Sequence, residues 1–288
     1  MWIKTLKLQA KLLRRARRRA IQRHRYPNIS ITDMPILFGN SFPKSGTHLL
    51  TQILASFPMF GLIVDSALPP ILTFDGPTGK RHAPKIILQE INRLLPGDVA
   101  YGHLHALPAT VTALCRDGIA PFFIYRDPRD VVVSHVHYVT EMAPNHVHHN
   151  YYKHELQDFD QRVRTSILGR PDIDISFPDI RARFEPYLPW LDQPEVMSIH
   201  FEDFITQLDQ TIGRVFDHTV ARGFITTIPR ADALEILAAG VNPKRSPTFR
   251  SGKVGGWRDS FTDEHKRLFK DVTGDLLTRL GYEKNSDW

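Results

Sequence analysis

Cysteine is nearly absent from this sequence, since the 288 residues contain one, Cys115. A lone cysteine excludes an intrachain disulfide and a cysteine-rich metal site, and it fits a cytoplasmic protein, whose thiols stay reduced. The sequence also lacks the run of about 20 apolar residues that spans a bilayer. Its longest uncharged stretch, residues 49–64, is shorter and contains Pro58. Because there is no low-complexity tract and no repeat with a period of about 20–50 residues, a disordered chain and a solenoid are excluded.

Acidic residues are missing from the first 32 positions, which hold ten lysines and arginines. The rest of the chain holds 27 basic and 31 acidic residues, so its net charge is −4 although the whole chain carries +6. The basic character therefore belongs to a leader, residues 1–32, and not to the domain at 33–288. We expect no general nucleic-acid-binding surface on that domain.

The leader is predicted to form a basic amphipathic helix, because at about 100° per residue one side is basic and the other largely apolar. Such helices typically lie on anionic membrane surfaces, so we expect residues 1–25 to hold the protein peripherally at a membrane. A solvated helix that docks nowhere or packs on the acidic domain, a mitochondrial-type presequence and a nucleic-acid-binding segment remain alternatives. The basic side comprises Lys4, Lys7, Lys11, Arg14, Arg15 and Arg18, and the other side Trp2, Ile3, Leu6, Ala10, Leu13, Ala16 and Ala20.

From Pro35 onward, short apolar runs alternate with segments of helical periodicity, which is typical of α/β proteins. The run PFFIYR at 121–126 is apolar over its first five residues, as a parallel strand buried on both faces requires. We therefore predict a single P-loop-containing α/β domain with a central parallel sheet flanked by helices. Strands are expected at 36–42, 99–104, 121–126 and 196–200, helices at 47–57, 108–116, 204–221, 231–239 and 262–280, helices and loops over the sheet at 142–183, and a long functional loop at 242–256.

The first motif that carries chemistry is FPKSGTH at residues 42–48. An expected strand enters it and an expected helix leaves it, which points backbone N–H groups and a helix N-terminus at one place. Lys44 adds a positive charge there, and Ser45 and Thr47 add hydroxyl donors, so the motif predicts a phosphate site. It is not a Walker A loop, because Gly39 precedes the lysine by five positions rather than six and the motif's own glycine follows it. A nucleoside triphosphate with Mg²⁺ is therefore disfavoured.

Two further motifs place basic residues at expected ends of secondary structure. YRDPRDVVVS at 125–134 follows the buried strand and opens a helix. Arg126 at the strand end and Ser134 two helical turns on can both bind a phosphate, although a salt-bridged helix N-terminus would explain this motif alone. FRSGKVGGWR at 249–258 combines three glycines with three basic residues, which suits a loop that closes over an anion.

Together, and in this order, the three motifs resemble those of the sulfotransferases that use 3′-phosphoadenosine-5′-phosphosulfate (PAPS). In that family PKSGT binds the 5′-phosphosulfate, R-[DN]-x-x-D-x-x-x-S binds the 3′-phosphate, and R-x-G-x-x-G-x-W closes over it. The resemblance covers roughly residues 35–280 and includes FEDF at 201–204, which is similar to the family's YEDL. It implies transfer of a sulfuryl group from PAPS as co-substrate, without a metal, to an acceptor hydroxyl, which is lipid-linked or on a glycan in our prediction. The implied cofactor-binding residues are Lys44, Ser45, Gly46, Thr47, Arg126, Ser134, Arg250, Gly252 and Lys253.

The resemblance also implies a histidine base, since the acceptor hydroxyl must lose its proton. The stretch YGHLHALP at 101–108 is similar to the family's K-[TS]-H-L-P. His103 aligns through the leucine that follows it and is the predicted base, with Lys44 as the second catalytic residue. His105 aligns through the following proline and is the alternative base.

Four positions in the phosphate and base motifs also depart from the family's pattern. His48 and Leu49 stand where many members have Thr-Trp, whose tryptophan stacks on adenine, so the adenine must be held in another way. Ser251 and Tyr101 each stand where the family has a lysine. These departures leave open a catalytically inactive nucleotide-binding or membrane-adaptor protein on the same fold. A P-loop kinase is a third interpretation, which the glycine positions of the first motif disfavour.

Six histidines gather after the second motif. Neutral imidazole is a common metal ligand, but the group contains no cysteine and has no regular spacing. A role in the acceptor pocket or at the surface is therefore favoured over a metal site. The six are His135, His137, His146, His148, His149 and His154.

Overall fold

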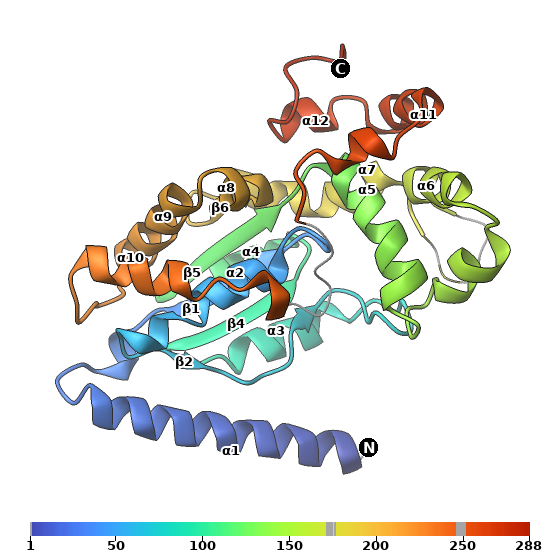
Figure 1. Ribbon diagram of the computed structural model, residues 1–288. Helices are drawn as coiled ribbons and strands as arrows, with labels where there is room; N and C mark the ends of the chain where they lie inside the picture. The colour runs from blue at the N-terminus through green and yellow to red at the C-terminus, as the bar shows by residue number, and fades with distance from the viewer. Residues whose placement is uncertain (1, 171–174, 176, 246–251) are drawn as a thin grey trace.

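The structure, a computed structural model, describes residues 2–170, 175, 177–245 and 252–288. Its centre is a parallel sheet with strands in the order β2-β4-β1-β5-β6, and β3 also pairs with β4 (Figure 1). The predicted α/β domain with a central parallel sheet is confirmed. The strands are β1 (Ile36–Ser41), β2 (Val64–Asp65), β3 (Ile71–Leu72), β4 (Asp98–His103), β5 (Ile119–Tyr125) and β6 (Met197–His200).

Helices cover both faces of the sheet (Figure 1). Successive side chains of a strand point to opposite faces, and accordingly Leu37 belongs to one apolar cluster and Phe38 to the other. The first cluster is covered by α2 (Thr47–Leu54), α9 (Leu208–Ala221) and α10 (Arg230–Ala239), and the second by α3 (Pro84–Asn92), α4 (Pro108–Cys115) and α5 (Pro128–His137). The other α-helices are α1 (Trp2–Arg25), α6 (Phe159–Leu168), α7 (Ile180–Phe184), α8 (Phe201–Thr206), α11 (Asp263–Thr273) and α12 (Leu276–Arg279).

Four strands begin and end within about two residues of the sequence prediction, but two long helices were predicted wrongly as continuous. The helix expected at 204–221 is split into α8 and α9 at Gln207, whose φ of −143° is not helical. The helix expected at 262–280 is split into α11 and α12 because Gly274 ends α11 with a φ of 53°. β2 and β3 have two residues each, too few to show a period, and the sequence does not predict them.

The carboxyl ends of β1, β4 and β5 meet at one edge of the sheet, where ligands of parallel sheets usually bind. The Asn40 side chain bridges two of these ends. Its Nδ2 donates to Leu104 O at 3.0 Å and its Oδ1 accepts from Leu104 N at 2.8 Å. Because Leu104 directly follows His103, this pair of hydrogen bonds fixes the end of β4 beside β1.

The basic helix α1 lies beside β2 at one edge of the sheet (Figure 1). Its contact with the domain includes an ion-pair cluster around Asp98, which is completely buried. Arg15, only 5% exposed, donates from Nε to Asp98 Oδ1 at 3.2 Å and pairs with Oδ2. Arg19 donates to the same carboxylate at 3.1 Å, and so does the backbone N–H of Leu95 at 2.8 Å. Both oxygens of Asp98 therefore have partners.

The opposite side of α1 faces solvent. Leu13 is 72% exposed and Ile21 is 56% exposed. Arg18 pairs with Asp65 at the solvent-exposed margin of the contact. The leader thus turns part of its basic side toward the domain, as one alternative from the sequence expects, and leaves apolar side chains outside. No helix in the described part of the chain combines the length and the apolar character that crossing a membrane requires.

Candidate functional site

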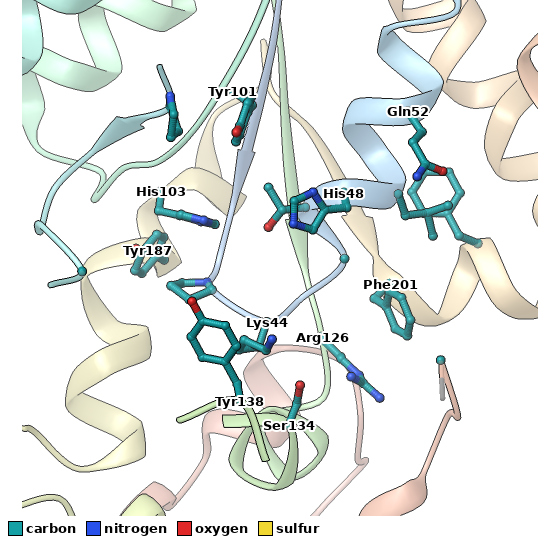
Figure 2. Close-up of a pocket in the computed structure, with 18 of the residues that line it drawn as sticks. Lys44, His48, Gln52, Tyr101, His103, Arg126, Ser134, Tyr138, Tyr187 and Phe201 are labelled. Carbon is teal, nitrogen blue, oxygen red and sulfur yellow. The ribbon is translucent and has the colours of Figure 1, made fainter. Parts of the chain in front are cut away.

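A cavity of about 760 Å³ opens at the carboxyl ends of the strands. Residues from all three sequence motifs line it, among them Lys44, Arg126, Ser134 and Gly252, together with the predicted base His103 (Figure 2). Motifs that are more than 200 residues apart in the sequence therefore meet in one cavity. Arg250 lies outside the described residues.

The loop between β1 and α2 has the backbone of an anion site. Lys44 adopts a φ of 68° and Gly46 a φ of 92°, so the chain turns sharply into the helix. A Cβ at Gly46 would lie 2.5 Å from the Phe201 ring, which leaves room for glycine alone. Gly46 is also the N-cap of α2 and has no side chain to accept the first N–H groups of the helix. Within the described residues no side chain caps this helix end, which suits the binding of an anion there.

The hydroxyls of this loop differ in their partners. Thr47 Oγ1 lies 2.7 Å from Ser41 Oγ, which itself lies 3.0 Å from His103 Nδ1. Ser45 Oγ is buried and has no hydrogen-bond partner among the described residues. A buried hydroxyl without a partner costs free energy, and a phosphate oxygen would satisfy it.

Arg126 leaves the end of β5 and directs its guanidinium along the cavity (Figure 2). Its NH2 donates to Lys253 O at 2.8 Å and to Asp130 Oδ2 at 3.3 Å, and its Cζ lies 4.6 Å from the centre of the Phe201 ring. Its buried Nε has no hydrogen-bond partner within the described parts of the chain. The NH2 group of Arg126 is thus anchored, while its Nε–H is placed to donate to a ligand.

Asp130 connects the second motif to the third. Its Oδ2 accepts from the backbone N–H of Gly255 at 2.9 Å, and its Oδ1 accepts from that of Trp257 at 2.8 Å. Asp130 is not among the site residues predicted from the sequence, although it is the second acidic position of the family's pattern. Lys253 reaches the site through its carbonyl, while its ammonium pairs with the exposed Asp259.

The remaining charges of the second motif are structural. Asp127 caps α5 by accepting from the backbone N–H of Arg129 at 2.9 Å, and it also pairs with the Arg129 guanidinium. That guanidinium is buried against Glu283 and between the rings of Trp257 and Trp288. The salt-bridged helix N-terminus considered from the sequence therefore exists beside the cavity residues, in the same ten positions.

His103, the last residue of β4, projects into the cavity (Figure 2). Its Nδ1 lies 3.0 Å from the carbonyl oxygen of Ser41, an atom that can only accept, so Nδ1 carries the proton. The lone pair is then on Nε2. Burial lowers the pKa of this imidazole below its ordinary 6.5, and the neighbouring His48 and Lys44 lower it further, so the ring is neutral near pH 7.

His105 lies outside the cavity lining. Its ring packs edge-on against Tyr187 at 4.9 Å and against Phe74 at 5.3 Å. Burial and the charge of Arg81 lower its pKa to about 4. The environment of His105 is therefore that of a packed aromatic residue.

The two sides of the cavity differ in their lining. On the β4 side, the walls are largely apolar and aromatic, with Leu72, Phe74, Tyr138 and Tyr187 around His103. Lys44 stands between the sides, and its Nζ lies 4.0 Å from the centre of the Tyr138 ring. On the side of α2 and α8, the lining residues are Leu49, Gln52, Phe201, Phe204, Leu208 and Val241.

The histidines at the end of α5 and after it are packed in the protein in different ways. His146 lines the cavity, and burial together with His148 lowers its pKa to about 4. His135 stacks on Phe177, with ring centres 5.0 Å apart. Among the described residues, no three histidine, cysteine or acidic side chains converge as metal ligands do.

The chain is similar in sequence to known proteins. Residues 121–219, from β5 to α9, match the family model of the sulfotransferase domain. Flavonol 3-sulfotransferase of Flaveria bidentis is 24% identical over 249 residues, which cover 79% of this chain and 77% of that protein. Sulfotransferase 6B1 of Danio rerio is 21% identical over 266 residues, with coverage of 86% and 80%.

Solved structures share the fold. Mouse sulfotransferase SULT7A1, complexed with PAP, superimposes with a TM-score of 0.57 at 19% identity and covers 88% of each chain. Retinol dehydratase in complex with androsterone and the inactive cofactor PAP gives a TM-score of 0.56 at 16% identity, with coverage of 86% and 83%. The match to the sulfotransferase-domain model and the similarity to two curated sulfotransferases, on a fold that these structures share, support placing the chain with the PAPS-dependent sulfotransferases.

Proposed function

We propose that this protein transfers a sulfuryl group from PAPS to the hydroxyl of an apolar acceptor, with His103 as the base. One observation carries the proposal. Groups suited to two phosphates and a neutral imidazole with a free lone pair line the same cavity. Solved relatives on this fold are complexed with PAP, which is the bisphosphate that remains after sulfuryl transfer.

The residues present fit PAPS. The unpartnered Ser45 Oγ, the N-terminus of α2 and the Lys44 ammonium suit the 5′-phosphosulfate. The free Nε of Arg126, with Ser134 beside it, suits the 3′-phosphate. The apolar lining on the side of α2 and α8 suits the adenine, and Phe201 offers an aromatic ring where Leu49 cannot stack.

In the reaction, His103 and Lys44 act on opposite ends of the transfer. Bound PAPS supplies the activated sulfuryl group. His103 Nε2 accepts the proton of the acceptor hydroxyl while the acceptor oxygen forms its bond to sulfur. The bond from sulfur to the phosphate oxygen breaks, and its electron pair stays on that oxygen. Lys44 stabilises this charge, and the loop backbone holds the phosphate in line.

The acceptor is proposed from the lining of the β4 side. Leu72, Phe74 and Tyr187 surround His103 with apolar surface, which favours an apolar alcohol or phenol, or the lipid part of a lipid-linked acceptor, over a bare glycan. Retinol dehydratase is known in complexes with retinol and with androsterone. An acceptor of similar apolarity would fit here.

The decisive experiment pairs turnover with binding. Wild-type protein and the His103→Ala variant are given radiolabelled PAPS with a panel of phenols, sterols, aliphatic alcohols and glycolipids, and bisphosphate affinity is measured by calorimetry. We expect His103→Ala to lose about 10²–10⁴ in rate while binding of the bisphosphate persists. Bisphosphate binding without turnover in the wild type would favour the inactive alternative. Stabilisation by ATP with Mg²⁺ but not by the bisphosphate would favour the kinase.

We also propose that α1 holds the protein on an anionic membrane through its outer face. Exposed Leu13 and Ile21 support this, with Arg14 and Arg17 exposed beside them. Deleting α1 would uncover Asp98, so the better variant is Leu13→Glu with Ile21→Glu, both in solvent. We expect the wild type, and not this variant, to sediment with anionic vesicles. Equal sedimentation of the two would contradict the proposal.

A further inference from the structure

We infer that His48 is a further catalytic residue, whose imidazole donates an N–H hydrogen bond to the phosphate oxygen that departs from sulfur. The inference rests on the proposed sulfuryl transfer and assigns that site a donor beyond Lys44. It concerns a position where this chain departs from the usual motif, since a histidine follows the PKSGT sequence.

The location of His48 supports this role. It is the second residue of α2, directly after the phosphate loop, and its side chain lines the cavity. Figure 2 shows the His48 and His103 rings on facing sides of the cavity, with Lys44 below them in this view. The transferred sulfuryl group has to pass between the base on one side and the phosphate loop on the other. His48 belongs to the loop side, where the leaving oxygen must lie.

The state of the imidazole suits a donor. Burial lowers the pKa of His48, and the positive charge of Lys44 lowers it further. A neutral imidazole has one N–H donor and one lone pair. The N–H can stabilise a developing negative charge without transferring a proton, as a neutral histidine at a helix N-terminus is known to do elsewhere.

The two histidines then have separate tasks. His103 Nε2 takes the acceptor proton, and the electron pair of the broken sulfur–oxygen bond stays on the phosphate oxygen, where His48 and Lys44 donate to it. No proton leaves His48, so the reaction balances with His103 as the sole base. A donor that is strongest toward the separated phosphate acts on the transition state more than on bound PAPS.

The test compares His48→Leu, which removes the donor, with His48→Gln, which keeps a neutral N–H donor of similar reach. His154→Gln is the matched control, because His154 is exposed and lies outside the cavity lining. Three quantities are measured for each variant: kcat with radiolabelled PAPS and the best acceptor of the panel, acceptor-free hydrolysis of PAPS, and the dissociation constant of adenosine 3′,5′-bisphosphate.

We expect His48→Leu to lower kcat by about 10²–10³, as loss of one donor to a developing oxyanion does, and to slow hydrolysis as well. His48→Gln should retain kcat within about tenfold of the wild type. Wild-type kcat in His48→Leu, or equal losses in the two His48 variants, would overturn the donor role while the proposed function stands. A wild-type protein that neither binds the bisphosphate nor transfers sulfate overturns both.

Discussion

Two arginines, Arg15 beside the β2 edge of the sheet and Arg126 at the carboxyl end of β5, show two ways in which this protein uses a buried charge. Arg15 on α1 meets a carboxylate whose two oxygens are both occupied, by Arg15, by Arg19 and by a backbone N–H. Arg126 at the cavity is anchored through NH2 alone, and its buried Nε has no partner among the residues that the structure describes. The first arrangement is complete without a ligand, and the second is not.

The difference separates residues that stabilise the fold from residues that we propose to bind a ligand. A buried charge with a full set of partners contributes to folding, and removing one partner leaves the other uncompensated. A buried donor without a partner weakens the fold, and a bound anion satisfies it. Ser45 shows the same incompleteness, and Arg129, three positions after Arg126, is fully paired.

The largest effect is expected at the completed cluster. Asp98→Ala should lower the free energy of unfolding by about 3–5 kcal/mol, because it leaves buried Arg15 without a counter-charge. The matched control is Asp65→Ala, which removes the exposed partner of Arg18 and should cost about 0–1 kcal/mol. Chemical denaturation measures both. Equal losses in the two variants would show that the cluster is no more than a surface contact.

The next effect is expected at the incomplete site. Arg126→Ala should weaken binding of the bisphosphate by about 1.5–3 kcal/mol, roughly tenfold to a hundredfold, with little change in unfolding temperature. Lys44→Ala should behave in the same way. Arg129→Ala is the control from the same motif and should lower the unfolding temperature instead. Calorimetry measures the bisphosphate affinity and thermal unfolding measures the stability of each variant. If both arginine variants changed the same one of these two quantities, the predicted contrast would be wrong.

A smaller effect is expected at Asp130, which connects Arg126 to the backbone of the third motif. Asp130 accepts from two backbone N–H groups of the third motif and from Arg126. Asp130→Asn has one acceptor oxygen fewer, so we expect a loss of about 1 kcal/mol in bisphosphate affinity, somewhat under tenfold. Asp259→Asn, which changes only the exposed partner of Lys253, should leave the affinity unchanged. Equal bisphosphate affinities in the two variants would show that Asp130 does not contribute to binding.

The smallest expected effect is a shift in the pH dependence of kcat/KM. With neutral His103 as the proposed base, we expect turnover to fall as the pH drops through the pKa of this imidazole. Burial lowers that pKa, and the acid limb of kcat/KM should therefore lie below the ordinary 6.5 of histidine. His105→Gln should leave the limb in place. An acid limb above pH 6.5, or one that shifts in His105→Gln, would show that His103 is not the base.

The sequence leads to several cavity-lining residues, the proposed phosphate-binding ones, because they lie in contiguous motifs. The loop at 42–48 and Arg126 with Ser134 each lie within ten positions, at the ends of strands that periodicity identifies. Asp130 was visible in the same motif, but its two backbone partners lie 125 and 127 residues away, and no local signal shows them.

The β4 side of the cavity, which we propose to bind the acceptor, could not be predicted in this way. Phe74, Tyr138 and Tyr187 come from three separate segments that only the fold brings together. Their neighbours include β3, which has two residues, and a π-helical turn at Tyr138–Met142, both too short for a periodic pattern. The leader shows the same limit. Its amphipathic pattern was clear, but the side that meets the domain depends on Asp98, a single buried carboxylate.

The contact between Arg15 and Asp98 also has a consequence for the order of folding. The two residues are 83 positions apart, so α1 is synthesised well before the strand that binds it. Contacts of such separation carry a large loop-closure entropy and form late. Until β4 is in place, α1 presents its arginines unpaired. We therefore expect Asp98→Ala to accelerate unfolding far more than it slows refolding, which makes this edge a determinant of how long the folded state persists.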